Sequence, residues 1–278
     1  MFEGGPPPPP KVNSELCVPD CFLLQARGVT AMPLTPPLRR HYHLGMSSPR
    51  APLTGRIRQT VGACLVTLAA CHRTPAPAPA ARALLLDPTS PEFTRPAPPV
   101  SRLRFETTKG TFVLELHRDW GPLGADRLYN LARLGYFTDT RFHRVRAAYI
   151  AQWGLHGDSA VNAAWKGRYL RDDPPRSRNT RGTFAFSYEG PGREHTRNTQ
   201  LYVNLADNPR NDAEPFTVLG TVVEGMAVLD SLYSGYGEDA GSGVRQGKQG
   251  PLERGGNAYM DREFPKLDRI RRVMITPP

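Results

Sequence analysis

The stretch RFHRVRAAYIAQWGLHGD, residues 141–158, contains two strand-like pieces, residues 142–145 and 148–152. Upstream, apolar and polar side chains alternate in residues 102–107 and 111–116, on either side of Lys109-Gly110, which is typical of a β-hairpin. Further strand-like pieces follow at residues 183–187, 200–205, 216–223 and 270–275. These patterns predict a mainly β domain of eight strands.

Two helices are expected beside these strands. Residues 124–134 follow Pro122 and place Leu128 and Leu131 on one face, and residues 226–233 form a second, shorter amphipathic stretch. Many short strands with only two helices predict a closed or nearly closed antiparallel eight-stranded barrel that the helices cap at its ends. The Gly-rich residues 235–250 are expected to form a loop.

The first hundred residues differ in composition from the rest of the chain. Of the 29 prolines, 19 lie in residues 1–100. A segment so rich in Pro and Ala buries too little apolar surface to offset the entropy of ordering. We therefore expect one folded domain, residues 101–278, behind a front in which residues 1–45 are disordered and residues 72–100 form a tether.

Residues 46–71 have the layout of an export signal. Basic side chains after Met46 precede the short apolar run VGACLVTLAA, residues 61–70, which is too short to span a bilayer. The run ends in LAAC at Cys71 and resembles the lipobox of bacterial lipoproteins, whose cysteine carries the lipid. We expect a lipoprotein of the bacterial cell envelope that faces the periplasm, is anchored to the membrane only through Cys71, and has its true start at Met46.

Charge and cysteine content exclude several classes of protein. Residues 101–278 hold 26 basic and 21 acidic side chains, which are interspersed without a long Lys/Arg run, so no nucleic-acid partner is expected. All four cysteines precede residue 72, which excludes a disulfide framework for the domain. The histidines do not cluster with acidic residues at ligand spacing, so no metal is expected.

Four segments carry a resemblance to a known family. FHRV at residues 142–145 is followed by Gln152, eight residues after Arg144. Then come GTFAFSYEGP, TQLYVN and FTVLGTVVEGM, at residues 182–191, 199–204 and 216–226. In order and spacing these segments resemble the cyclophilin-type peptidyl-prolyl cis/trans isomerases. Residues 232–237, 255–259 and 264–267 further resemble a C-terminal extension of a bacterial branch that is commonly exported.

The resemblance implies a cyclophilin-like barrel and an isomerase that acts on proline-containing polypeptides without a cofactor, in the folding of exported proteins. It implies that Arg144 is the catalytic donor and that Gln152 orients it. The substrate-binding residues that it implies are Tyr149, Ile150, Ser187, Tyr188, Gln200, Tyr202 and Phe216. We expect the chain to act as a monomer.

Several of these positions depart from the commonest pattern of the family. Tyr149 and Tyr202 stand where Phe is usual, and Ile150, Tyr188 and Phe216 replace Met, Asn and His. Arg210 and Asn211 stand where many members have Trp-Leu. These changes leave open an alternative function, a catalytically weak proline-peptide-binding or chaperone-like module.

Overall fold

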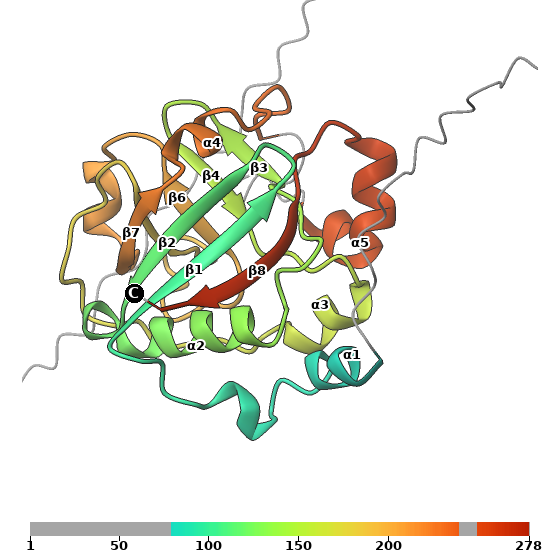
Figure 1. The fold of residues 1–278 in the computed structure, drawn as a ribbon, viewed down its shortest axis with the longest axis horizontal. Coiled ribbons are helices and arrows are strands. Elements are labelled where there is room, and N and C mark those ends of the chain that lie inside the picture. Colours follow the sequence, from blue (N-terminus) through green and yellow to red (C-terminus); the bar gives the residue numbers. More distant parts are fainter. Residues whose placement is uncertain (1–78, 239–248, 278) are drawn as a thin grey trace, which may run out of the picture. The chain divides into compact units, whose positions relative to one another are not determined.

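The computed structural model describes residues 79–238 and 249–277, and the predicted leader, signal and Cys71 lie outside them. Within these residues, eight strands form one antiparallel sheet in the order β3-β4-β6-β5-β7-β2-β1-β8 (Figure 1). The strands are β1 (Val100–Thr107), β2 (Thr111–His117), β3 (Arg144–Arg146), β4 (Ile150–Trp153), β5 (Thr183–Phe186), β6 (Leu201–Asn204), β7 (Val218–Glu224) and β8 (Ile270–Thr276). Each overlaps a predicted strand.

The expected closed barrel is wrong, because the sheet is curled but open between its two outer strands. β3 and β8 lie at opposite ends of the strand order. Only an isolated bridge, Arg141 with Arg269, joins the segments that precede them, with Phe142 N donating to Asp268 O at 2.9 Å. In this antiparallel register β3 would face residues 264–266, which precede β8, so the two outer strands do not pair with each other.

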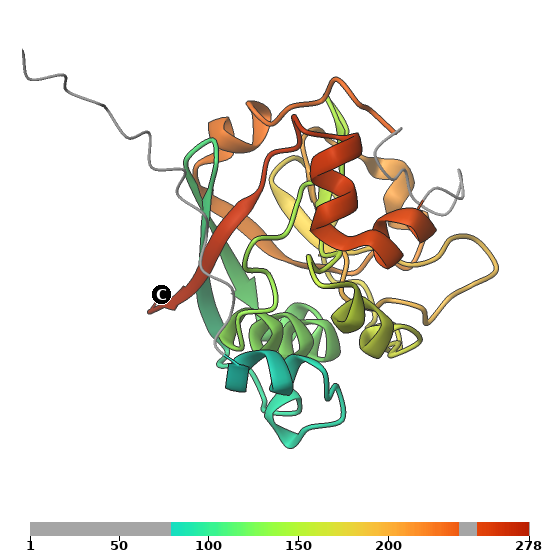
Figure 2. The ribbon, with the colours of Figure 1, turned by 90° about the vertical axis from the view of Figure 1, so that its right-hand side faces the viewer.

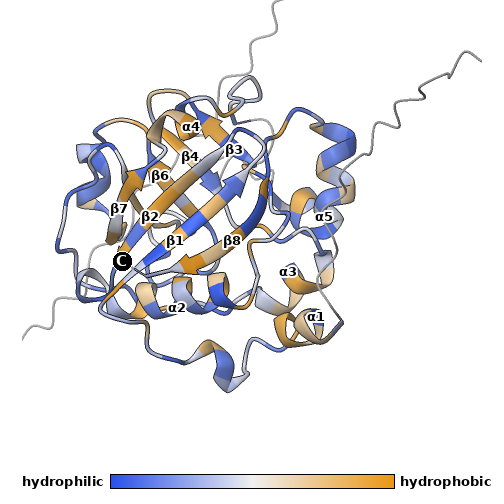
Figure 3. Cartoon of the chain, viewed as in Figure 1, coloured by the Kyte–Doolittle hydropathy of each residue, from blue (hydrophilic) through white to orange (hydrophobic). Residues whose placement is uncertain are grey.

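Alternating side chains of the strands build the core. β1 alternates partly exposed and buried residues along its whole length, as its sequence predicts. Phe105 of β1 stacks on Phe112 of β2 with ring centroids 4.8 Å apart, and Trp153 of β4 meets Phe105 edge-on at 5.6 Å. Figure 3 shows apolar residues concentrated on the strands, whereas much of α5 is hydrophilic.

The described residues contain more helices than the two expected. They are α1 (Pro79–Leu85), α2 (Pro122–Arg133), α3 (Ser159–Trp165), α4 (Met226–Asp230) and α5 (Gln249–Glu263), with 3-10 turns at Pro91–Phe93, Arg118–Trp120 and Pro209–Ala213. α2 and α4 are the predicted helices. Figures 1 and 2 show α1, α2 and α3 gathered at one end of the sheet and α4 at the other. No helix in the described ranges is long and apolar enough to cross a membrane.

Residues 79–99 pack on the domain, whereas the sequence had suggested that they belong to a loose tether. Leu85 is fully buried and Phe93 is nearly so. Trp165 of α3 donates its indole N–H to Leu85 O at 2.9 Å and meets the Phe93 ring edge-on at 4.8 Å. These buried side chains outweigh the Pro/Ala-rich composition, because a few large apolar contacts suffice to order a short segment.

Candidate active site

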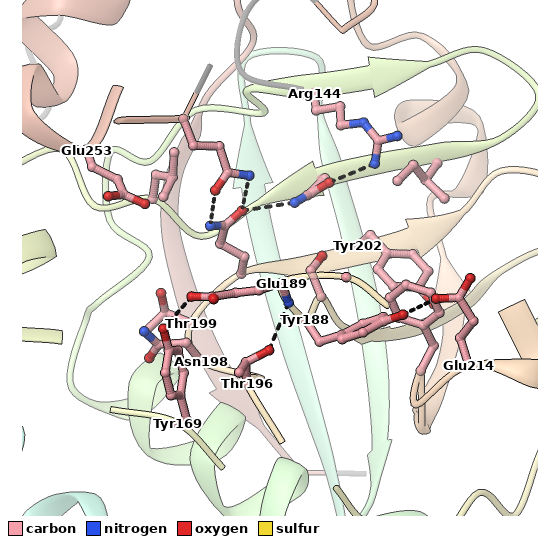
Figure 4. Close-up of a pocket in the computed structure, with 18 of the residues that line it drawn as sticks. Arg144, Tyr169, Tyr188, Glu189, Thr196, Asn198, Thr199, Tyr202, Glu214 and Glu253 are labelled. Atoms are coloured by element: carbon pink, nitrogen blue, oxygen red, sulfur yellow. Dashed lines mark hydrogen bonds between the residues drawn. The ribbon is translucent and has the colours of Figure 1, made fainter. Parts of the chain in front are cut away.

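The structure brings the nine site residues predicted within the domain together in one pocket of about 410 Å³ (Figure 4). They are Arg144, Tyr149, Ile150, Gln152, Ser187, Tyr188, Gln200, Tyr202 and Phe216. The tenth predicted residue, Cys71, lies outside the described residues. The lining of the pocket includes residues of β3, β4 and β6.

Strand register explains why residues distant in sequence meet here. Arg144 on β3 pairs with Gln152 on β4, and Gln152 pairs in turn with Tyr202 on β6. Residues directly opposite each other on neighbouring strands project from the same face of a sheet. The turn between β3 and β4 contains Ala148 at φ 54°. It reverses the chain, so that Arg144 and Gln152, eight residues apart in sequence, lie side by side.

A chain of hydrogen bonds fixes the polar side of the pocket. Arg144 Nη1 donates to Gln152 Oε1 at 3.1 Å, and Gln152 Nε2 donates to Gln200 Oε1 at 2.9 Å. Gln200 Nε2 then donates to Gln249 Oε1 of α5 at 2.9 Å. Each amide thus has one defined orientation. The chain points the Gln152 carbonyl oxygen at Arg144, which limits where the guanidinium can turn.

An apolar surface lies beside this polar chain. Ile150, Ala185 and Tyr202 form a buried cluster separate from the main core, and Tyr149 and Phe216 pack against it. Phe216 meets the Tyr202 ring edge-on at 5.3 Å. A ring-sized apolar group could rest on this surface while a neighbouring polar atom faces Arg144.

Cations surround the Tyr149 ring at the edge of the pocket. The guanidinium carbons of Arg144, Arg146 and Arg210 lie 5.8, 5.0 and 4.4 Å from the ring centroid. The Tyr149 hydroxyl donates to Asn211 Oδ1 at 3.4 Å. The two positions at which this chain has Arg-Asn instead of Trp-Leu therefore contribute a charge and a polar contact to the pocket edge.

Tyr188 and Ser187 border the pocket from the segment after β5. The Tyr188 ring meets Phe216 edge-on at 4.9 Å, and its hydroxyl donates to the Glu214 carboxylate. Ser187 is held by its backbone, since Ser187 N donates to Gln200 O at 2.8 Å. The large ring at position 188 is thus turned toward the wall made by Phe216.

Among the pocket residues that sequence reasoning missed, three come from the C-terminal part of the domain. Gln249 and Glu253 come from α5, and Glu238 comes from the segment after α4. Glu238 Oε1 accepts a hydrogen bond from Arg144 Nη2 at 2.6 Å. Its partial burial favours the neutral acid, but the hydrogen bond and the charge of Arg144 outweigh burial and lower the pKa of Glu238. No periodic pattern links this segment to β3, so the contact could not be predicted from the sequence.

His143, which directly precedes Arg144, is packed inside the domain. It is fully buried. Burial and the neighbouring Arg144 cation lower the pKa of His143 to about 4, so the ring is neutral at neutral pH.

Several known proteins are similar to this chain. Residues 102–249 match the family model described as cyclophilin type peptidyl-prolyl cis-trans isomerase/CLD. A peptidyl-prolyl cis-trans isomerase-like 1 of Neurospora crassa is 31% identical over 127 residues, which cover 45% of this chain and 76% of the relative. A peptidyl-prolyl cis-trans isomerase of Helicobacter pylori is 30% identical over 132 residues, 47% of this chain and 78% of the relative. The solved structure of a cyclophilin type peptidyl-prolyl cis-trans isomerase from Cryptosporidium parvum aligns with TM-score 0.47 and 18% identity, over 64% of this chain and 99% of that one.

Proposed function

Because this chain belongs to the cyclophilin-type peptidyl-prolyl cis-trans isomerase family and is an enzyme of that type, we propose that Arg144 drives its reaction and that its substrates are exported polypeptides. The pairing of Arg144 with Gln152 beside an apolar surface is the observation that carries the proposal.

Rotation of an X-Pro bond requires few catalytic groups. An X-Pro bond rotates slowly because resonance gives the amide a barrier of roughly 18–20 kcal/mol. Twisting the amide ends the resonance and leaves a basic lone pair on the proline nitrogen. A guanidinium aimed at that nitrogen stabilises the twisted amide more than either planar form, which is the condition for catalysis. No nucleophile, general base or metal is required for this rotation.

The pocket offers these groups in suitable positions. Arg144 supplies a donor that stays charged, and Gln152 orients it through the 3.1 Å hydrogen bond. The proline ring would rest on the apolar surface made by Tyr149, Ile150, Tyr202 and Phe216. The substrate backbone would pair with Gln200 and with the edge of the segment at Ser187 and Tyr188.

We further propose that the enzyme acts in the bacterial cell envelope. This location is supported by the order of basic, apolar and small residues that ends in LAAC at Cys71. Two measurements bear on it, the mass of the mature N-terminus and the distribution of the protein between membrane and soluble fractions. A lipid-modified Cys71 at the N-terminus is the expected result, and an uncleaved, unmodified chain in the soluble fraction contradicts it.

A substitution of Arg144 tests the catalytic role. Arg144→Ala should lower kcat/KM on a proline-containing peptide about a hundredfold, the usual loss when one transition-state donor is removed. Arg271→Ala is the matched control, since Arg271 is an exposed arginine of β8 outside the pocket. Both variants should keep the thermal midpoint close to that of the wild type. Equal isomerase rates in the two variants contradict the role of Arg144.

A further inference from the structure

One carboxylate from outside the predicted site binds the proposed catalytic arginine. Glu238 Oε1 accepts from Arg144 Nη2 at 2.6 Å and from Arg146 Nη1 at 3.1 Å. The side chains of Arg144 and Glu238 are only 15% and 22% exposed. An ion pair so shielded is screened less by water than a surface pair, so its geometry is better defined.

The segment that carries Glu238 is anchored to the C-terminal part of the domain. Tyr236 packs edge-on between Tyr233 and Phe264, with ring centroids 5.0 and 5.3 Å away. Tyr233 N donates to Asp268 Oδ2 at 2.7 Å. Gly237, at φ 52°, turns the chain directly before Glu238. These contacts aim the carboxylate at the pocket.

The Glu238 carboxylate also lies between two positive charges of β3. Arg144 and Arg146 are two residues apart on one strand and therefore project from the same face. Both guanidinium groups lie near the Tyr149 ring and bind the same oxygen of Glu238. A negative charge between the two cations offsets part of their mutual repulsion and favours the orientation in which Arg144 faces the pocket.

The two partners of Arg144 hold opposite branches of its guanidinium. Gln152 accepts from Nη1 and Glu238 accepts from Nη2. Each of these nitrogens carries two hydrogens, so one hydrogen on each is left for another acceptor. The buried Nε has no partner among the described residues. Because both terminal nitrogens of the Arg144 guanidinium are already hydrogen-bonded, the side chain loses little further rotamer entropy when a substrate binds.

We propose that Glu238 is a positioning residue of the isomerase, which holds the Arg144 guanidinium in the orientation that faces the proline nitrogen. The inference rests on the proposed catalytic role of Arg144. Glu238 acts through the arginine, so its loss lowers kcat more than it raises KM.

Variants at position 238 test this role by their effect on turnover. Glu238→Ala should lower kcat about tenfold or more, because a displaced catalytic group is costly. Glu238→Gln keeps an oxygen acceptor in the same place but loses the charge, so it should lose less activity than Glu238→Ala. Glu224→Ala, an exposed glutamate at the end of β7 and outside the pocket, serves as the control and should match the wild type.

A double-variant cycle shows whether the effect passes through Arg144. In the Arg144→Ala background, measured at higher enzyme concentration, Glu238→Ala should cause no further loss of kcat. The inference is overturned if Glu238→Ala equals or exceeds the wild-type rate, if Glu238→Gln loses as much as Glu238→Ala, or if the tenfold loss persists in the Arg144→Ala background. A wild-type chain without an Arg144-dependent rate would instead remove the proposed catalytic role, and the inference with it.

Discussion

Tyr202 illustrates how a single residue keeps the pocket wall apolar despite its hydroxyl. Its ring faces Phe216, and its hydroxyl donates to Asn179 Oδ1 at 2.8 Å. The same oxygen accepts from Asn204 Nδ2 at 3.2 Å. The hydroxyl is therefore bound within a buried polar network, and the ring lines the pocket as the Phe that is usual in the family would.

Removal of this hydroxyl should affect stability more than catalysis. Tyr202→Phe should lower the free energy of unfolding by about 1 kcal/mol, the usual net value of a hydrogen bond, and change kcat/KM less than about twofold. Tyr202→Ala, which removes the ring, is the comparison and should raise KM strongly. Thermal unfolding and isomerase kinetics measure both effects. A tenfold loss of kcat/KM in Tyr202→Phe would show that the hydroxyl meets the substrate.

The site residues within the domain were predicted from the family resemblance, and the resemblance did not point to Glu238. Arg144 and Gln152 are eight residues apart in one hairpin, so their meeting follows from a local pattern. Glu238 is 94 residues from Arg144, and the residues around it have no alternation that fixes their register. Contacts of that kind depend on tertiary packing, which a single sequence does not display.

At the scale of elements, the strands were predictable because alternation of side chains reveals them. The helices were less so. α3 has seven residues, too few for a clear helical period, and is capped by the preceding Asp158, whose side chain accepts from Ala160 N at 2.9 Å. α5 contains the glycines of GPLERGG, which disfavour a helix, and is kinked at Gly256 with φ 55° and ψ −150°. Packing against α3 stabilises it despite that composition.

The kink of α5 should be intolerant of any side chain. A Cβ at Gly256 would lie 2.2 Å from Gly157 O, and the backbone there is open only to glycine. Gly256→Ala should lower the free energy of unfolding by several kcal/mol, since backbone strain and a steric clash add together.

A matched glycine separates strain from clash. Gly167 also has a positive φ, 73°, but a Cβ there would meet nothing within 4 Å. Gly167→Ala should therefore cost only about 1 kcal/mol in a denaturant-unfolding measurement. Equal losses of stability in the two variants would contradict the claim that Gly256 is required by its close approach to Gly157.

At the scale of the whole molecule, the domain combines an open curled sheet with helices at both ends (Figures 1 and 2). The sequence predicted its class and strands, but it did not predict the gap between β3 and β8. That gap depends on how far the pairing continues beyond Arg141 and Arg269, which local patterns do not encode. Residues 79–99 were also beyond prediction, because Leu85 and Phe93 are isolated apolar residues in a Pro/Ala-rich stretch.

The stability of the whole domain should depend on pH through His143. Its pKa is about 4 in the folded chain, against 6.5 for an unperturbed histidine, so the unfolded chain binds the proton first as pH falls. The free energy of unfolding should decrease below about pH 6.5, and the histidine should account for roughly 2 kcal/mol of the loss between pH 7 and 5. The stability that neutral His143 contributes is fully present above pH 7.

The variant His143→Gln isolates this contribution. It does not titrate, so its free energy of unfolding should decline less steeply than that of the wild type between pH 7 and 5. The buried His156, whose pKa is also lowered, mainly by burial, is present in both proteins and cancels in the comparison. Parallel declines in the two proteins would contradict a buried neutral His143.

The central claim is that Arg144, held beside the apolar surface of the pocket, speeds the rotation of a bound X-Pro bond. NMR exchange between the cis and trans signals of a proline peptide, with enzyme far below the peptide concentration, measures binding and rotation in one sample. The account predicts rapid exchange with the wild type, and with Arg144→Ala a peptide that still binds but exchanges slowly. A wild-type chain that binds the peptide and leaves its exchange at the uncatalysed rate would contradict the claim.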